Sequence, residues 1–149
     1  METIYLLDTN VVSELMRPQP ATEVLAWIDA QGTGALAFSS VGCWEIRYGL
    51  ACMTEGRRRK DLERRFDALV RALFGAGIYD FTQAAAVCCA NLMRAKRDLG
   101  ECLDAHLPDA MIAGIAAAEG LCVATRNAAE FDHCGVEWID PWRADSSRL

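Results

Sequence analysis

Short apolar runs, each the length of one buried strand, recur along the chain and constrain its fold more than any other feature. They occupy residues 4–7, 35–38, 78–81, 121–124 and 136–139, of which the third and the last are interrupted by Asp80 and Glu137. The first run ends at Asp8, and the last one is followed by Asp140 and Pro141. Continuous apolar runs of this length are typical of strands that are covered on both faces, as in parallel sheets. We therefore expect these runs to form a central sheet.

The segments between the runs have the apolar spacing of helices. The predicted helices cover residues 10–16, 22–30, 40 to about 54, 57–74, 83 to about 99, and 109–119. Residues typical of helix boundaries stand at their ends, namely Ser39 or Ser40, Thr82, Gly100, Pro108 and Gly120. Strands that alternate with helices predict an α/β fold with a short, mainly parallel central sheet surrounded by helices.

The composition is that of a globular protein. The chain has 149 residues, of which 52% are hydrophobic and 24% charged, and this is enough to bury one core. We therefore expect a single domain over residues 1–149. No apolar run approaches the roughly 18 residues of a membrane span, and residues 1–8 lack the basic region of a signal peptide. The expected location is the cytoplasm, without membrane association.

Cysteine and histidine give no metal or disulfide pattern. The seven cysteines form an odd set without C-x-x-C spacing, and the two histidines are His106 and His133. This excludes the usual patterns of disulfide scaffolds and zinc fingers. We expect most of the cysteines to be reduced, small core residues. The histidines have no supporting group of residues, so no role is assigned to them.

Charge is unevenly distributed. The formal net charge is −6, which argues against binding of nucleic acid through net charge alone. Residues 57–71 carry seven basic and three acidic side chains, a local charge of +4, so the rest of the chain sums to −10. This segment could guide RNA through its phosphates. A solvated helix face is the favoured interpretation, because acids are interleaved with the basic residues.

Acidic and polar side chains gather at the expected carboxyl edge of the sheet. Asp8 follows the first strand, and Arg126 and Asn127 follow the fourth. Glu45 lies early in the helix after the second strand, and Asp109 begins the helix before the fourth. Ligands of open α/β sheets bind at this edge, so these residues are the candidates for chemistry.

Two of the acids are set on apolar helix faces. Glu45 shares its face with Val41 and Tyr48, and Asp109 shares its face with Ile112. An ionised carboxylate in such a place is costly unless it is paired or bound to a cation. Several carboxylates without neighbouring basic residues therefore indicate a Mg²⁺ or Mn²⁺ site. A metal of this kind activates water for attack on a phosphodiester.

Each acid also has a purely structural interpretation. Asp8 could cap the helix that follows it. Glu45 could be a buried acid paired with Arg47 or Arg126. Asp109 could only stabilise the dipole of its helix. Composition and spacing by themselves do not decide between these structural interpretations and a metal site that the three acids form together.

Four segments carry a more specific signal. They are LLDTNVVSEL with Arg17-Pro18 at residues 6–18, WEIRYG at 44–49, PDAMIA at 108–113, and finally VATRN, EF and DPW at 123–127, 130–131 and 140–142. Together they resemble PIN-domain proteins of the VapC toxin family, especially its FitB-like branch. One such segment would be a weak signal, whereas four in the expected order over nearly the whole chain are specific.

The resemblance implies a PIN-like α/β/α sandwich and a divalent-metal-dependent endoribonuclease that hydrolyses RNA phosphodiester bonds. Asp8, Glu45 and Asp109 match the three main acids of the family, which would hold Mg²⁺ or Mn²⁺. The matching accessory positions are Thr9, Asn10, Thr125 and Arg126.

The sequence departs from the family pattern near these acids. The fourth acidic position, after Thr-Arg, is Asn127 here. Its amide oxygen accepts a metal or water contact but brings no charge, which leaves open whether one or two metals bind. A longer stretch before Asp109 makes Asp104 a further candidate ligand.

The resemblance also implies partners. They are an RNA substrate such as tRNA or rRNA, and a cognate antitoxin whose C-terminal segment covers the acidic site, often with an inserted arginine. The expected assembly is a homodimer, or a hetero-oligomer with the antitoxin. A housekeeping PIN nuclease without a toxin role and a non-catalytic PIN binding module are the alternatives. The tryptophans at 27, 44, 138 and 142 are expected in core and dimer contacts rather than in base stacking.

Overall fold

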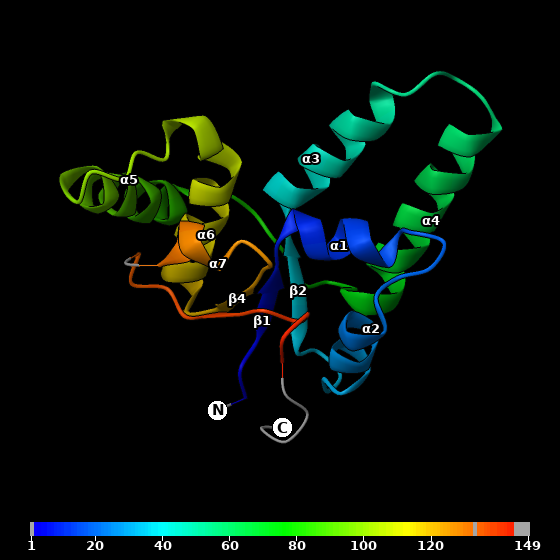
Figure 1. Ribbon diagram of the computed structural model, residues 1–149, viewed down its shortest axis with the longest axis horizontal. Helices are drawn as coiled ribbons and strands as arrows, with labels where there is room; N and C mark the ends of the chain where they lie inside the picture. Colours follow the sequence, from blue (N-terminus) through cyan, green and yellow to red (C-terminus); the bar gives the residue numbers. More distant parts are fainter. Residues whose placement is uncertain (1, 133, 145–149) are drawn as a thin grey trace.

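A central sheet of parallel strands organises the computed structural model, which describes residues 2–132 and 134–144 (Figure 1). The strands are β1 (Tyr5–Leu7), β2 (Leu36–Ser39), β3 (Ile78–Tyr79), β4 (Cys122–Ala124) and β5 (Trp138–Ile139). Their order is β3-β2-β1-β4-β5, and every neighbouring pair is parallel. The predicted α/β fold with a mainly parallel sheet is confirmed.

The helices begin and end close to their predicted positions. They are α1 (Thr9–Leu15), α2 (Thr22–Asp29), α3 (Ser40–Ala51), α4 (Arg57–Leu73), α5 (Gln83–Asp98), α6 (Leu107–Glu119) and α7 (Ala128–Phe131), with a 3-10 turn η1 (Asp104–His106). Ser39 and Thr82 cap α3 and α5 through their side-chain oxygens. The sequence analysis missed η1 and α7, because elements this short contain no hydrophobic period.

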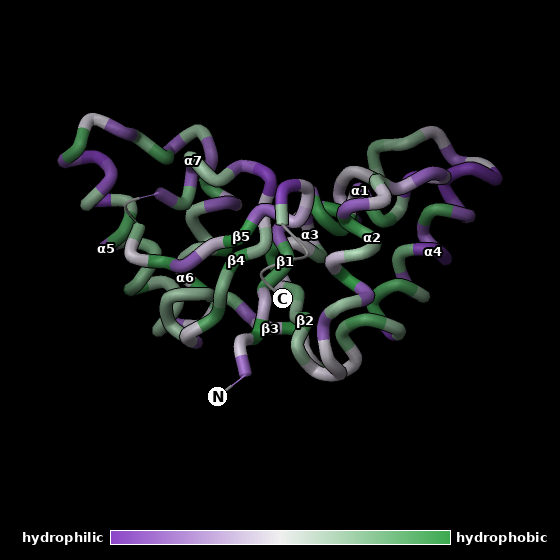
Figure 2. Tube along the Cα trace, turned by 60° about the horizontal axis from the view of Figure 1, so that its bottom comes forward, coloured by the Kyte–Doolittle hydropathy of each residue, from purple (hydrophilic) through white to green (hydrophobic). Residues whose placement is uncertain are grey.

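Alternate residues of the strands face two separate cores. In β1, Leu6 packs with residues of α5 and α6, while Leu7 packs with residues of α1, α2 and α4. In β4, Val123 and Ala124 divide in the same way. Figures 1 and 2 show the result, with α5, α6 and α7 on one side of the sheet and α1, α2 and α4 on the other. The carboxyl ends of β1 and β4 are left between these two groups of helices.

The tryptophans and cysteines only partly occupy the expected core positions. Trp27 is buried and packs edge-on against Tyr5, with ring centroids 5.0 Å apart. Trp44 and Trp138 are exposed. All seven cysteines are free, but of these only Cys89 and Cys122 are buried. In the described part of the chain, no helix combines the length and the apolar character needed to cross a bilayer.

The contact between α5 and α6 depends on Gly114. A Cβ atom at this position would lie 2.6 Å from the carbonyl oxygen of Ala85 and 2.7 Å from the Cβ of Cys89. Real Cβ atoms do not approach other atoms so closely, so only glycine allows the present spacing of the two helices. This spacing matters because α6 carries Asp109 near its first turn.

We predict that Gly114→Ala destabilises the protein by about 1–3 kcal/mol, because the added methyl group forces α5 and α6 apart. Gly49→Ala in α3 is the control, since a Cβ there would meet no atom of the described chain within 4 Å. That change should be neutral or stabilise by about 0.5–1 kcal/mol. Urea unfolding measures both variants, and equal effects would contradict the steric argument.

Candidate active site

Asp8 is buried at the point where β1 ends. Its N–H donates to the carbonyl oxygen of Ala124 at 2.8 Å, which extends the pairing of β1 with β4 up to the site. Its Oδ1 accepts from the N–H of Thr9 at 2.8 Å and thereby caps α1. Its Oδ2 accepts from Thr125 Oγ1 at 2.8 Å and from Asn10 Nδ2 at 3.1 Å. The capping role and the place at the site therefore coexist in one side chain.

Glu45 is oriented by a hydroxyl group and not by an arginine. Its Oε1 accepts from Thr9 Oγ1 at 2.6 Å. The pairings considered from the sequence are not formed, because Arg47 pairs with an aspartate of α4 at 2.7 Å. The guanidinium of Arg126 stacks on Trp142, with its central carbon 4.8 Å from the ring centroid. Thr9 thus links the carboxylate of Glu45 to the helix that Asp8 caps.

Asp109 lies near the start of α6 beside two side chains from other elements. Three side chains offer one possible metal-ligand atom each, and these atoms all lie within 4.8 Å of one another. The three residues are His106, Asp109 and Glu130. His106 Nδ1 is 3.4 Å from Glu130 Oε1. The statement that His106 lacks a supporting group of residues was therefore wrong, and His133 lies outside the described residues.

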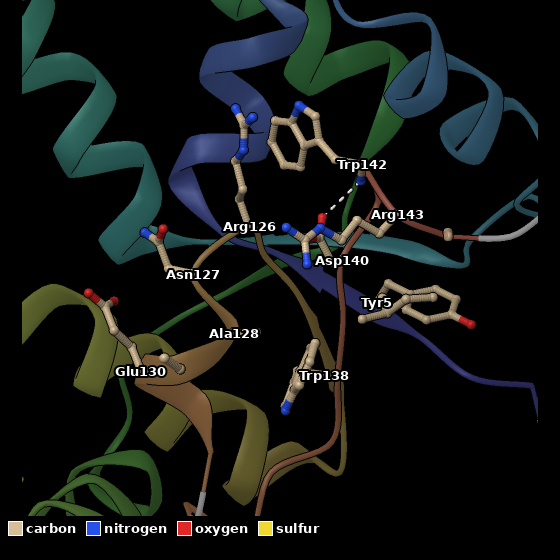
Figure 3. Close-up of a pocket in the computed structure, with 12 residues that line it drawn as sticks. Tyr5, Arg126, Asn127, Ala128, Glu130, Trp138, Asp140, Trp142 and Arg143 are labelled. Carbon is tan, nitrogen blue, oxygen red and sulfur yellow. Dashed lines mark hydrogen bonds and ion pairs between the residues drawn. The ribbon is translucent and has the colours of Figure 1, made fainter.

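Glu130 is the acid that the sequence analysis did not assign to the site. It lies on α7, where it approaches Asp109. The sequence did contain a signal for this residue, because Glu130 and Phe131 form one of the segments that resemble the family. From the sequence, the fourth acidic position of the family was placed at Asn127, one turn earlier, with Asp104 as a further candidate ligand. Figure 3 shows Asn127 and Glu130 projecting to the same side of the chain.

The acids raise one another's pKa values. Burial, followed by the negative charge of Asp109, raises the pKa of Asp8 to about 6, although its hydrogen bonds from Thr125 and Thr9 oppose the shift. Burial, followed by the contact with Glu130 and its charge, raises the pKa of Asp109 to about 7. The pKa of Glu45 is also raised, mainly by burial. The site thus concentrates negative charge at a high energetic cost.

Asp8, Glu45 and Asp109 line a cavity of about 540 Å³, whereas Glu130 lies outside its lining. Its lining consists of Asp8, Thr9, Asn10, Ser13, Glu14, Arg17, Glu45, Asp109, Arg126, Asn127 and Trp142. Glu14 was not foreseen, but it accepts from Arg17 at 3.1 Å and from the N–H of Ala21 at 3.2 Å, so it holds the turn after α1. Asp104 is exposed in η1 and does not line this cavity. No residue of the basic helix α4 lines it either.

The donor set fits a hard divalent cation. Among the described residues, no lysine or arginine forms an ion pair with Asp8, Glu45 or Asp109. Glu130 Oε2 and Asn10 Oδ1 are buried acceptors without a hydrogen-bond partner in that part of the chain. Carboxylate and amide oxygens without a countercharge are the ligands preferred by Mg²⁺ and Mn²⁺.

Comparison with known proteins agrees with this geometry. The sequence profile of the PIN domain matches residues 5–136. This chain is a PIN-domain protein. It is 37% identical to the VapC ribonuclease Y4jK of Sinorhizobium fredii over 92% of this chain and 96% of that protein. It is 33% identical to toxin FitB of Neisseria gonorrhoeae over 92% of this chain and 97% of that protein. It therefore belongs to the VapC and FitB-like toxin family.

A solved structure has the same fold as this PIN domain. The crystal structure of FitAcB from Neisseria gonorrhoeae superposes with a TM-score of 0.86 and 31% sequence identity, covering 95% of this chain and 100% of that chain. The PIN-like arrangement of sheet and helices expected from the resemblance is thereby confirmed.

A buried lysine holds α7 in place within the PIN domain. Lys96 on α5 is 1% exposed, and its Nζ donates to Glu101 Oε2 at 2.7 Å and to the carbonyl oxygen of Ala129 at 3.1 Å. Ala129 directly precedes Glu130 in the chain. Lys96 therefore connects the long helix α5 to the short helix that carries the fourth acid.

We predict that Asp109→Asn stabilises the metal-free protein in a pH-dependent way. The pKa of Asp109, at about 7 in the fold, lies above its usual value near 4. Folding therefore favours the protonated form, and this contribution is fully present below about pH 4 and is lost as the pH rises to about 7. In EDTA, the melting-temperature advantage of the variant should grow across this range and then stay constant. A constant advantage at every pH, or the same growth in the Asp61→Asn control on α4, would contradict the prediction.

We predict that Lys96→Met loosens α7 and weakens binding of Mn²⁺ by roughly 10-fold, as is typical when a residue behind a metal ligand is lost. Methionine retains the apolar stem but removes the donor to Ala129, while Glu101 is 48% exposed and stays hydrated. Amide hydrogen exchange over residues 128–131 and calorimetric titration with Mn²⁺ measure the two effects. Arg94→Met on the exposed face of α5 is the control. Unchanged exchange in Lys96→Met would show that α7 is held by other contacts.

Proposed function

We propose that this PIN-domain protein is a divalent-metal-dependent endoribonuclease and acts as the toxin of a type II toxin–antitoxin pair. The observation that carries the proposal is the convergence of Asp8, Glu45 and Asp109, with Glu130 beside Asp109, while no described lysine or arginine pairs with the first three. A structural ion-pair network would neutralise such charge, whereas a nuclease site needs it for a cation. The VapC ribonuclease and the FitB toxin are relatives over most of the chain.

The side chains of the site are held in place before any ligand arrives. Thr9, Thr125 and Asn10 together donate three hydrogen bonds to Asp8. The hydroxyl of Thr9 fixes Glu45. When bound, Mg²⁺ or Mn²⁺ lowers the pKa of bound water and offsets the charge that develops on phosphate oxygens. The protein contributes the ligand geometry and the burial of Asp8, which strengthens these electrostatic effects.

Glu130 supplies the charge that Asn127 lacks. Asn127 lines the cavity with an uncharged amide, while Glu130 approaches Asp109 from α7. We therefore assign Asp8, Glu45 and Asp109 as the main metal ligands, with Glu130 as the fourth acid and Asn127 as a neutral contact. Thr9, Asn10, Thr125 and Arg126 are accessory residues, because they position the acids or line the cavity's rim.

The same cavity suits inhibition by a basic partner. Relatives of known structure were crystallised as toxin–antitoxin complexes, including FitAcB. An arginine from the C-terminal segment of an antitoxin would satisfy the acids that lack a countercharge. We place this interaction in the cytoplasm, with the toxin as a homodimer or in a hetero-oligomer with its antitoxin.

The decisive experiment is cleavage of labelled single-stranded RNA, tRNA and rRNA fragments. We expect cutting with Mg²⁺ or Mn²⁺, and no cutting with EDTA, with Asp8→Asn or with Asp109→Asn. Asp104→Asn is the matched control, since this acid is exposed outside the cavity, and it should cut at the wild-type rate. Cutting that survives EDTA and both site variants would overturn the metal-dependent mechanism.

Two outcomes separate the alternatives. A folded, antitoxin-free protein that binds Mn²⁺ but cuts none of the RNAs would favour a non-catalytic PIN binding module. RNA cutting by a protein that does not arrest growth when expressed, with no short upstream frame for a DNA-binding protein, would favour a housekeeping nuclease. Growth arrest that Asp8→Asn relieves would support the toxin.

A further inference from the structure

A second and larger cleft lies beside the acidic cavity. Its volume is about 1270 Å³, and it runs along α7 and the residues before it, β5 and the turn that follows β5. Two arginines and three aromatic side chains are prominent in its lining, namely Arg126, Arg143, Tyr5, Trp138 and Trp142 (Figure 3). The site described above does not use Tyr5, Trp138 or Arg143.

The cleft and the acidic cavity are continuous. Arg126, Asn127 and Trp142 line both of them. The stacked pair of Arg126 and Trp142 therefore stands at their boundary. A polymer whose phosphodiester lies at the acids would extend from there into the cleft.

The acids of the cleft are already engaged, which leaves its basic groups available. Asp140 accepts from the N–H of Trp142 at 2.9 Å, and Glu130 belongs to the cluster with Asp109. The side chain of Arg143 is 89% exposed, and its Nε lies 3.9 Å from Asp140. A long, exposed ion pair of this kind is worth little, so Arg143 is free to contact an anionic ligand.

Trp138 presents a fixed aromatic surface at the edge of the sheet. It lies on the terminal strand β5 and is 39% exposed. Its indole N–H donates to Asp132 Oδ1 at 3.1 Å, which restricts the ring to one orientation. Rigid aromatic rings beside basic side chains in a groove are typical of sites for single-stranded nucleic acid, because every base offers a face for stacking.

We propose that this cleft binds the nucleotides on one side of the scissile bond of a single-stranded RNA, with Trp138 stacking on a base and Arg143 contacting a phosphate. The proposal rests on the proposed nuclease function. It revises the expectation that Trp138 serves in core or dimer contacts rather than in base stacking, because the ring lies outside the core and is exposed in the cleft beside the site.

The test measures binding of a fluorescein-labelled RNA of about 12 nucleotides, a length within the usual range of such sites, by anisotropy at several salt concentrations. All proteins carry Asp8→Asn, so that the RNA is not cut. We compare Trp138→Ala, Trp138→Phe and Arg143→Ala. Arg94→Ala is the matched control, because Arg94 is also an exposed arginine with an acidic neighbour on its own element.

The two kinds of variant should differ in a way that separates stacking from charge. Trp138→Ala should weaken binding roughly 10-fold at every salt concentration, whereas Trp138→Phe should retain most of the affinity. Arg143→Ala should reduce the slope of log affinity against log salt by about 0.7, the value for one contact to a single-strand phosphate. The Arg94→Ala control should change neither quantity.

Shortened RNAs complete the test. Removing nucleotides from one end should abolish the effect of Trp138→Ala, while removing them from the other end should leave it intact. If both cleft variants bind RNA like the Arg94→Ala control, and also cut it like that control when Asp8 is restored, the cleft proposal is overturned and the nuclease stands. If the wild type neither binds nor cuts RNA, the proposed function fails first, and the cleft proposal falls with it.

Discussion

The buried carboxylate of Asp8 is the constraint on which the rest of the site depends. It sits where β1 ends and α1 begins, with its N–H bonded to the last residue of β4. Hydrogen bonds from Thr125 and Thr9 oppose the shift, yet burial, followed by the nearby charge of Asp109, raises its pKa to about 6. The fold thus keeps several like charges together, which is costly in the free protein and useful once a cation binds.

The acids of the site are positioned by elements on both sides of the sheet. The side with α1 and α3 supplies Asp8, Thr9 and Glu45, joined by short hydrogen bonds. The side with α5, α6 and α7 supplies Asp109 and Glu130. That second side is positioned by helix packing and by Lys96, a buried cation placed behind the site instead of within it. Among the described residues, no lysine or arginine pairs with the three main acids, so their negative charge is preserved for a ligand.

Charge also explains why an acidic protein is suited to a nucleic-acid substrate. The net charge of −6 includes the acids of the cavity, which a bound cation would partly neutralise. The basic helix α4 does not line the cavity, whereas Arg17 and Arg126 do, and Arg143 lines the neighbouring cleft. Under the proposed function, a cation bound at the acids and the nearby arginines would attract RNA phosphates, whereas the acids themselves would attract a basic antitoxin segment.

The hydrophobic period and the ends of the strands are properties of residues that are neighbours in the sequence. The sequence by itself therefore determined the strands and the longer helices. It also predicted that Asp8, Glu45, Asp109 and Asn127 lie at one edge of the sheet. It could not reveal α7, which spans only Ala128–Phe131, or the meeting of His106 with Glu130 across 24 positions. Nor could it separate a capping Asp8 from a ligand. Those features, and the cleft beside Trp138, arise only when β4 and β5 pair and α5 packs on α6, since contacts between distant residues depend on strand order and helix spacing.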